Sequence, residues 1–190
     1  MDGTDGATRD VSAPSAWLVA NRRLLPPSGD ALDLACGRGR NALWLAAEGF
    51  RTHAIDRDGQ ALETLRALGA ARGWRIDVRE RDLETGASVL EPGAYDVIVV
   101  VHYLHRALFP QILAALRPGG VLVYETFTTA QAARGRPTNP AFLLEPGELR
   151  GRVTGEWPGT VPVPPMAILA EREGEFDGRM VAGVVARRLP

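Results

Sequence analysis

Lysine is absent from the 190-residue sequence, and all 22 basic residues are arginine. Without a lysine amine, the chain cannot use a Schiff base, a P-loop lysine or a Lys-Asp-Lys-Glu tetrad. Cysteine is almost absent too, since Cys36 stands alone. One cysteine excludes an internal disulfide and a multi-cysteine zinc site. We therefore expect no metal site, and we expect a reducing, cytoplasmic environment.

Net charge and long hydrophobic runs are also lacking. The formal charge is −1, so no overall basic field would attract nucleic acid or an anionic membrane. No apolar run has the length that spans a bilayer. The opening residues MDGTDGATRD contain no apolar core of a secretory signal. We predict neither a nucleic-acid nor a membrane partner, and we expect residues 1–12 to form a flexible tail.

Short strand-like runs alternate with helical patterns, which is typical of βαβ units around a parallel sheet. The strands predicted first are Ala31–Ala35, Arg51–Ile55, Trp74–Arg79, Tyr95–Val101 and Val121–Thr126. The run Tyr95–Val101 is almost continuously β-branched, as in a strand buried on both faces. Gly49 and Gly69 are predicted to end the first two helices. The Arg-Pro-Gly-Gly sequence at 117–120 predicts a turn before the strand that follows it.

After Thr126 the pattern becomes irregular. Residues 127–165 are rich in Gly, Pro, Arg and Thr, which indicates a lid or insertion at an acceptor site, with a short helix near Pro146–Leu149. Two β-like runs, Met166–Glu173 and Met180–Leu189, are joined through an Asp-Gly pair that predicts an antiparallel hairpin. The length suits one domain, so residues 13–190 are predicted to be a single doubly wound α/β domain.

A glycine-rich turn lies between the first predicted strand and helix. Gly37-Arg38-Gly39-Arg40-Asn41-Ala42 satisfies the dinucleotide pattern G-x-G-x-x-G/A, and Asp56 ends the second strand. Glycines let a backbone approach a ligand, and a helix N-terminus offers free N–H groups. An NAD(P)-dependent oxidoreductase is therefore one interpretation, and a plain tight turn without a ligand is another.

Two further carboxylates favour a different ligand. Asp33 lies inside the first strand, where a pyrophosphate would gain nothing from it, but a ligand with a cationic amine or sulfonium would be attracted. Asp82 follows the third strand, and the carboxyl ends of strands are where open α/β sheets bind ligands. These two positions indicate a sulfonium nucleoside in preference to a dinucleotide.

Five segments in this order resemble the motifs of class I S-adenosylmethionine-dependent methyltransferases. They are Asp33-Leu34-Ala35-Cys36-Gly37-Arg38-Gly39, Asp56-Arg57-Asp58, Asp82-Leu83, Tyr95-Asp96-Val97-Ile98 and Arg117-Pro118-Gly119-Gly120. The resemblance extends from about residue 15 to 127 and is nearest to the small tellurite-resistance-type subgroup. It implies a Rossmann-like, mostly parallel seven-stranded sheet of order 3-2-1-4-5-7-6, ending in an antiparallel hairpin.

The resemblance also implies a cofactor, S-adenosyl-L-methionine, with S-adenosyl-L-homocysteine as its product. Carried over by position, the cofactor contacts are Trp17, Asp33, Ala35, Gly37, Gly39, Asn41, Asp56, Arg57, Asp82, Leu83, Val101 and His102. Asp56 would accept both ribose hydroxyls, and Asp82 would accept from the adenine amine. Asp33 would reach the methionine amino group, directly or through water.

The acceptor side is less well defined by the sequence. In-line methyl transfer mainly requires two reactants to be held together away from water. Catalytic candidates are His102, Tyr103 and His105, which follow the fourth strand, since histidine is the natural base near neutral pH. Acceptor-binding candidates are Tyr103, Arg106, Phe127, Arg134 and Arg136. Because arginine binds carboxylate and phosphate well, an anionic small molecule is one possible acceptor.

The function predicted by this sequence is S-adenosylmethionine-dependent methyl transfer to a small-molecule acceptor. Two alternatives remain open, an NAD(P)-dependent oxidoreductase and a non-enzymatic protein that binds S-adenosylmethionine. The acceptor atom and the oligomeric state, monomer or homodimer, are left undecided.

Overall fold

The computed structural model describes residues 13–86 and 88–190, so the expected tail at 1–12 lies outside the described residues. Helices span Ala16–Ala20 (α1), Arg40–Ala47 (α2), Gly59–Ala71 (α3), Phe109–Ala115 (α4) and Glu148–Thr154 (α5). Strands span Asp30–Leu34 (β1), Arg51–Asp56 (β2), Ile76–Glu80 (β3), Tyr95–Val101 (β4), Leu116–Phe127 (β5), Met166–Phe176 (β6) and Arg179–Arg188 (β7). Short 3-10 helices occupy Arg22–Leu24, Arg106–Leu108, Thr129–Ala133 and Pro140–Phe142.

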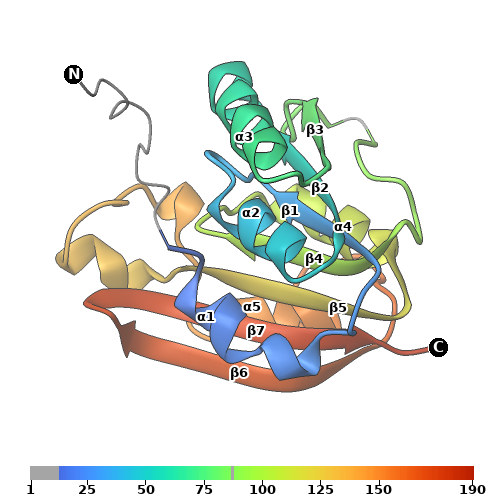
Figure 1. Cartoon of the computed structure of the whole chain (residues 1–190). Coiled ribbons are helices and arrows are strands. Elements are labelled where there is room, and N and C mark those ends of the chain that lie inside the picture. The colour runs from blue at the N-terminus through green and yellow to red at the C-terminus, as the bar shows by residue number, and fades with distance from the viewer. Residues whose placement is uncertain (1–12, 87) are drawn as a thin grey trace.

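The strands form one seven-stranded sheet of order β3-β2-β1-β4-β5-β7-β6 (Figure 1). The pairs among β1 to β5 are parallel, while β7 is antiparallel to both β5 and β6. At the β6–β7 turn, Asp177 and Gly178 have φ of 50° and 73°, the left-handed conformations that a two-residue hairpin turn requires. The expected strand order and the terminal hairpin are both confirmed.

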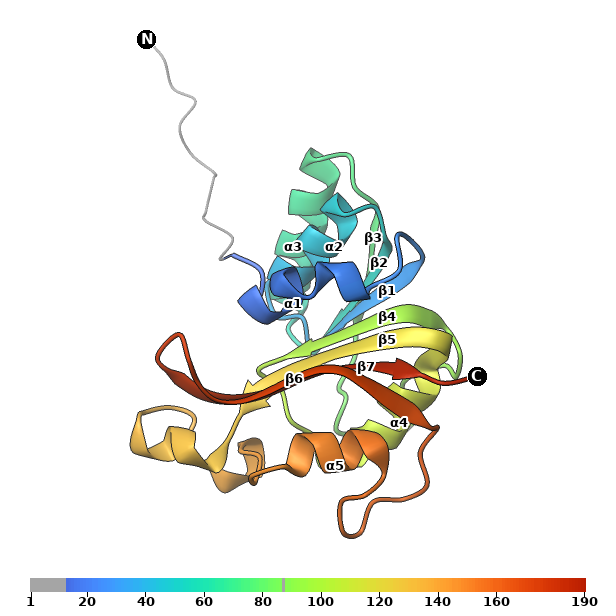
Figure 2. The same cartoon turned by 90° about the horizontal axis from the view of Figure 1, so that it is seen from below.

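Helices cover both faces of the sheet, as the view from below makes plain (Figure 2). α1, α2 and α3 lie on one face, where Trp17, Leu45 and Leu65 belong to the buried clusters. α4 and α5 lie on the other face, where Ile112 and Leu149 pack into the largest buried cluster. Because β1 to β5 are parallel, their carboxyl ends lie along one edge of the sheet, where the glycine turn connects β1 to α2.

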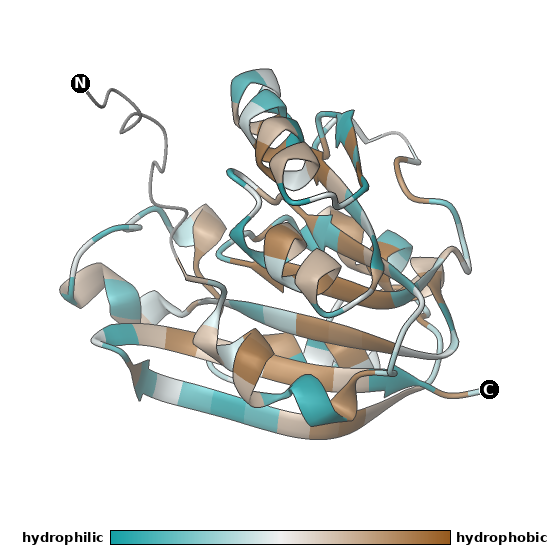
Figure 3. Cartoon of the chain, in the orientation of Figure 1, coloured by the Kyte–Doolittle hydropathy of each residue, from teal (hydrophilic) through white to brown (hydrophobic). Residues whose placement is uncertain are grey.

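The alternation of side chains along the central strands explains why both faces need cover. In β4, Val97 and Val99 pack under α1, whereas Ile98 and Val100 pack under α4. Successive strand residues point to opposite faces, so a strand that is apolar throughout is stable only between two layers. Figure 3 shows apolar residues along β5 and β7 and more polar residues along the outer strand β6.

Several predicted boundaries were wrong. β3 begins at Ile76 and not at Trp74, and α5 extends to Thr154. Two other errors concern turns. α3 continues through Gly69 to Ala71, and Gly73, with φ of 71°, turns the chain instead. The N–H groups of Gly73 and Trp74 donate to the carbonyls of Ala70 and Gly69, which is a Schellman ending. β5 begins at Leu116, because this residue already pairs with Tyr95. The predicted turn at 117–120 is thus an irregular stretch within the strand.

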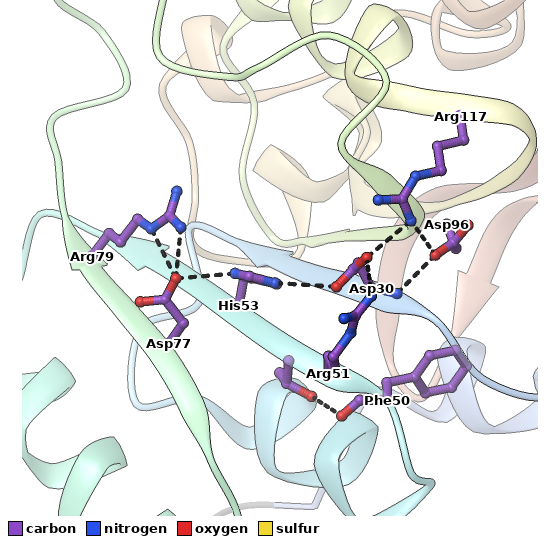
Figure 4. Close-up of polar contacts among 9 residues, drawn as sticks. Asp30, Phe50, Arg51, His53, Asp77, Arg79, Asp96 and Arg117 are labelled. Atoms are coloured by element: carbon purple, nitrogen blue, oxygen red, sulfur yellow. Dashed lines mark hydrogen bonds and ion pairs between the residues drawn. The ribbon is translucent and has the colours of Figure 1, made fainter.

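Ion pairs join the strands beside the amino-terminal ends of β1 and β4 (Figure 4). Asp30 on β1 binds Arg51 at 2.7 Å and Arg117 at 3.0 Å. His53 on β2 lies 3.1 Å from an Asp77 oxygen and 3.6 Å from an Asp30 oxygen. These contacts connect neighbouring strands away from the glycine turn, so the His53 side chain helps to hold the sheet together.

Candidate functional site

A cleft of about 590 Å³ opens at the carboxyl ends of the parallel strands. Its lining residues are Ala35, Asp56, Arg57, Arg81, Asp82, Leu83, Glu84, His102, Tyr103, Leu104, Phe127, Arg136, Pro137 and Phe142. They follow β1, β2, β3, β4 and β5 in turn, so one cavity joins segments from the whole parallel part of the sheet. This volume is within the ordinary range for pockets that bind small molecules.

Asp56 connects the second strand to the glycine turn. One of its carboxylate oxygens accepts from the Gly37 N–H at 2.7 Å, and the other accepts from the Asp58 N–H at 3.0 Å. Gly37 has φ of 52°, and a Cβ there would meet no atom within 4 Å. Open space above a glycine backbone is where a ligand can approach. Each Asp56 oxygen also keeps a second lone pair, which a ribose hydroxyl could use.

Ala35 ends the first strand in a conformation that alanine rarely adopts. Its φ is 54°, in the left-handed region that costs an L-residue about 1–2 kcal/mol. Glycine at this position removes that strain but loses more entropy on folding. We therefore expect Ala35→Gly to leave the free energy of unfolding unchanged or to raise it by up to about 1 kcal/mol.

A matched control for Ala35→Gly is Ala42→Gly, in a buried position of α2 with helical backbone. That change should cost about 1 kcal/mol or more. Urea denaturation of both variants gives the comparison. Equal losses of stability would show that the backbone at Ala35 is not strained.

Asp33 and Asn41 support the turn from below and do not line the cleft. Asp33 is 1% exposed, and its carboxylate accepts from the Ala42 N–H at 2.9 Å. Asn41 accepts from the Ser15 N–H at 2.9 Å, which ties the segment before α1 to α2. Burial raises the pKa of Asp33 to about 7, against the lowering effect of the hydrogen bonds from Ala42 and Asn41. Asp33 thus fixes the first turn of α2, whose free N–H groups border the glycine turn.

Asp82, Leu83 and Glu84 form the wall after β3. The Asp82 carboxylate accepts from the Glu84 N–H at 2.9 Å and so shapes its own turn. The Tyr103 hydroxyl lies 3.5 Å from a Glu84 oxygen, on the side of the cleft that follows β4. Burial raises the pKa of Tyr103 above its usual value, and Glu84 raises it further. Tyr103 is therefore a neutral hydroxyl near neutral pH.

His102 follows β4 with a strained backbone, since its φ is 58°. Its N–H donates to the Glu125 carbonyl at 2.8 Å, and its ring stacks on Phe127 at a centroid distance of 4.6 Å. Burial lowers the pKa of His102 to about 4, helped by the charges of Arg40 and Arg179. The ring is neutral near pH 7, so it can accept a hydrogen bond but is a weak base. Strain of this kind often marks a functional position.

Other predicted cofactor contacts lie away from the cleft. Trp17 is buried on the face of β7, beside Gly183, and the Arg172 guanidinium lies 4.7 Å from its ring centroid. Gly39 has φ of 76°, and a Cβ there would collide with Leu65 of α3. Val101 is buried in the core under α1. Gly39 thus serves close helix packing.

Among the predicted catalytic and acceptor residues, the structure separates two groups. His102, Tyr103, Phe127 and Arg136 line the cleft, whereas His105, Arg106 and Arg134 do not. Arg106 binds Glu148 at 2.7 and 2.8 Å and donates to the carbonyls at 141 and 143. Arg134 pairs with Glu175 of β6 at 2.8 Å. The sequence could not reveal these partners, since both acids come much later in the chain.

Five lining residues were not among the sequence predictions. They are Arg81, Glu84, Leu104, Pro137 and Phe142. Arg81, Glu84 and Leu104 stand next to predicted residues, so the ends of β3 and β4 were a signal for them. Phe142 lies on a 3-10 helix in the irregular stretch, and only the folded chain brings it to the cleft. No group of His, Cys, Asp and Glu within the described ranges could hold a metal ion.

Residues 31–120 match the family model described as "Methyltransferase domain". A curated relative, "Hemagglutinin 1" of Eikenella corrodens, is 32% identical over 127 residues, which are 63% of this chain. The chain covers 41% of that relative, so it spans about two fifths of the relative's length.

Solved structures share the fold over almost the whole chain. An S-adenosylmethionine dependent methyltransferase from Mesorhizobium loti is 22% identical with a TM-score of 0.68, covering 92% of this chain and 98% of that one. TehB from Haemophilus influenzae is 20% identical with a TM-score of 0.66, covering 90% and 61%. The chain therefore has the Rossmann-like fold of S-adenosylmethionine-dependent methyltransferases, with a methyltransferase domain match that includes the glycine turn. No helix of the described chain has the length and apolar character needed to cross a membrane.

Proposed function

We propose that this protein is an S-adenosylmethionine-dependent methyltransferase that acts on a small molecule. One observation carries the proposal most directly. The carboxylates of Asp56 and Asp82 follow neighbouring parallel strands and line the same cleft as Ala35 of the glycine turn. A nucleoside offers hydroxyl and amine donors, and carboxylates are the matching acceptors. The match of residues 31–120 to a methyltransferase domain supports the same conclusion.

The hydrogen-bonding groups of the described residues suit those of S-adenosylmethionine. Asp56 would hold the ribose, Asp82 and Leu83 would flank the adenine, and the open backbone at Gly37 would receive the methionine part. When bound, this cosubstrate supplies an activated methyl group whose bonding electrons remain with sulfur. His102 and Phe127 would form the wall near the reacting atoms and exclude water. A proton released by the acceptor could leave to solvent, because the neutral His102 ring is a weak base.

The size of the cleft supports a small acceptor over a macromolecule. Its volume is about 590 Å³, and the methyl donor and the acceptor would have to share this space. The net charge of −1 offers no basic field for nucleic acid. In-line displacement needs the acceptor on the side of the methyl group opposite to sulfur, and the residues after β4 and β5 provide that side.

A second candidate is a non-enzymatic protein that binds S-adenosylmethionine. The curated relative has a name, "Hemagglutinin 1", that mentions no enzyme. The weak basicity of His102 is also compatible with binding alone. The dinucleotide alternative is less favoured, since the Gly37 N–H, which a pyrophosphate would need, already donates to the Asp56 carboxylate at 2.7 Å.

Turnover separates the enzyme from the binder. The purified chain is incubated with S-adenosylmethionine labelled in its methyl group and a panel of small phenols, carboxylates, amines, thiols and metalloid anions. We expect binding of the methyl donor and a labelled small product. Binding without any labelled product would favour the non-enzymatic candidate, and no binding would contradict both.

A further inference from the structure

The cleft has two unlike halves. The half after β2 and β3 carries its acids, Asp56, Asp82 and Glu84, together with Arg57 and Arg81. The half after β4 and β5, which we call the aromatic half, consists of Tyr103, Leu104, Phe127, Arg136, Pro137 and Phe142. The sheet order β3-β2-β1-β4-β5 sets these two groups at opposite sides of the glycine turn. The first half suits a nucleoside, so the aromatic half is left for the acceptor.

Apolar rings dominate the aromatic half. Phe127 is held against His102 in a stack with an interplanar angle of 22°. Phe142 is 48% exposed, which is unusual for a phenylalanine, and it stands at the margin of the cleft. Flat apolar faces favour an aromatic ligand, because aromatic pairs gain energy beyond simple burial.

The segment that carries Phe142 is firmly anchored, so the exposed ring has a defined place. The N–H of Leu144 donates to the Phe127 carbonyl at 2.9 Å, and that of Thr129 donates to the Leu144 carbonyl at 2.8 Å. Arg106 also donates hydrogen bonds to the carbonyls of Ala141 and Leu143. These bonds close the loop 128–144 at its base and keep Phe142 beside the cleft.

Arg136 is the only charged side chain in the aromatic half. Several arginines that come after β4 in the chain are paired with acids: Arg106 and Arg152 with Glu148, Arg134 with Glu175, Arg150 with Glu171 and Arg172 with Glu125. Arg136 makes no ion pair with any acid of the described chain, and neither do Arg57 and Arg81, which line the other half of the cleft. A planar guanidinium without a partner, beside a cavity, is suited to a carboxylate.

From these features we propose that the acceptor is a small aromatic compound bearing a carboxylate. Its ring would lie against Phe127 and Phe142, and its carboxylate would bind the Arg136 guanidinium. The proposal rests on the proposed methyltransferase function, because the nucleoside must occupy the other half of the cleft. The methyl-accepting group would then point away from Arg136, toward His102 and the glycine turn.

Binding of three probes to the chain saturated with S-adenosylhomocysteine tests this acceptor class. The probes are 4-hydroxybenzoate, its neutral analogue 4-hydroxybenzyl alcohol, and the aliphatic acid 6-hydroxyhexanoate. We expect 4-hydroxybenzoate to bind about tenfold more tightly than the neutral alcohol, the smaller end of what a charged hydrogen bond contributes. We expect it to bind about two- to tenfold more tightly than the aliphatic acid, which has the carboxylate but lacks the ring. Arg136→Gln should lower the affinity for 4-hydroxybenzoate about tenfold and leave the affinity for the neutral alcohol unchanged.

Two further variants test whether the effects come from the charge of Arg136 and the ring of Phe142 in particular. Arg150→Gln removes an exposed arginine that pairs with Glu171 outside the cleft, so it should leave binding of all three probes unchanged. Phe142→Ala removes an exposed ring, so it should have little effect on folding. It should lower the affinity for both aromatic probes but not for the aliphatic acid. Binding of S-adenosylhomocysteine is measured first on each variant.

The outcomes distinguish the two proposals. If S-adenosylhomocysteine binds but the three probes bind alike, or Arg136→Gln has no more effect than Arg150→Gln, the aromatic-carboxylate acceptor is overturned and the methyltransferase proposal stands. If S-adenosylhomocysteine does not bind the unaltered chain, both proposals fail.

Discussion

Replacing Asp56 by alanine weakens the binding of S-adenosylhomocysteine by about 1.5–3 kcal/mol, the range for a hydrogen bond to a charged group. The loss has two sources. The ribose hydroxyls lose their acceptor, and the Gly37 N–H loses the carboxylate that now fixes the glycine turn at 2.7 Å. Isothermal titration of the variant gives the affinity directly.

Asp58→Ala is the matched control for Asp56→Ala. Asp58 lies two residues further on and accepts from the Ala61 N–H at 3.0 Å as the N-cap of α3. Its loss should lower the free energy of unfolding by about 1 kcal/mol but leave the affinity for S-adenosylhomocysteine unchanged. An unaltered affinity in Asp56→Ala would mean that Asp56 does not hold the ribose.

Replacing Arg106 by alanine lowers the free energy of unfolding by about 3 kcal/mol, since breaking a buried ion pair leaves an uncompensated charge. Glu148 is 1% exposed, and Arg106 holds both of its oxygens. Arg152 remains as a second partner, so the loss should fall at the lower end of the range for buried pairs. Urea denaturation measures it. Arg150→Ala breaks an exposed ion pair with Glu171, so it should lower the free energy of unfolding much less than Arg106→Ala does.

The same ion pair predicts how stability depends on pH. The hydrogen bonds from Arg106 lower the pKa of Glu148 to about 2 from an ordinary value of 4.5, against the opposing effect of burial. A lowered pKa contributes stability above the unfolded value, and this stability is lost as pH falls from about 4.5 to about 2. Arg106→Ala should therefore lose less stability than the unaltered chain over that window. Equal acid profiles would show that Glu148 does not depend on Arg106.

The sequence predicted the sheet well because its strands have strong local signals. Tyr95–Val101 was predicted with the bounds that β4 has, since a β-branched run buried on both faces has few alternatives. The Asp-Gly pair predicted the hairpin because these two residue types readily adopt the left-handed backbone of a two-residue turn. The helix end at Gly69 was wrong because that glycine serves packing: a Cβ there would lie 3.2 Å from Ile76 of β3.

The candidate site was predictable where residues follow strands in the chain. Asp56, Asp82 and His102 reach one cleft because the carboxyl ends of parallel strands meet at one edge of the sheet. No comparable rule predicts which residues of the irregular stretch after β5 reach the cleft. Arg106 and Arg134 are bound by acids 42 and 41 residues later, whereas Arg136 is left facing the cleft. Which arginine finds a partner is decided by tertiary packing, and sequence spacing carries little information about it.

The central claim is that the cleft binds a sulfonium nucleoside and not a dinucleotide. Parallel isothermal titrations of the unaltered chain with S-adenosylhomocysteine and with NADH test it most directly. Asp56 and Asp82 would serve the adenosine that both compounds carry, but the Gly37 N–H already donates to Asp56 and is not free for a pyrophosphate. We therefore expect binding of S-adenosylhomocysteine and no measurable heat from NADH. Binding of NADH alone would contradict the proposed function.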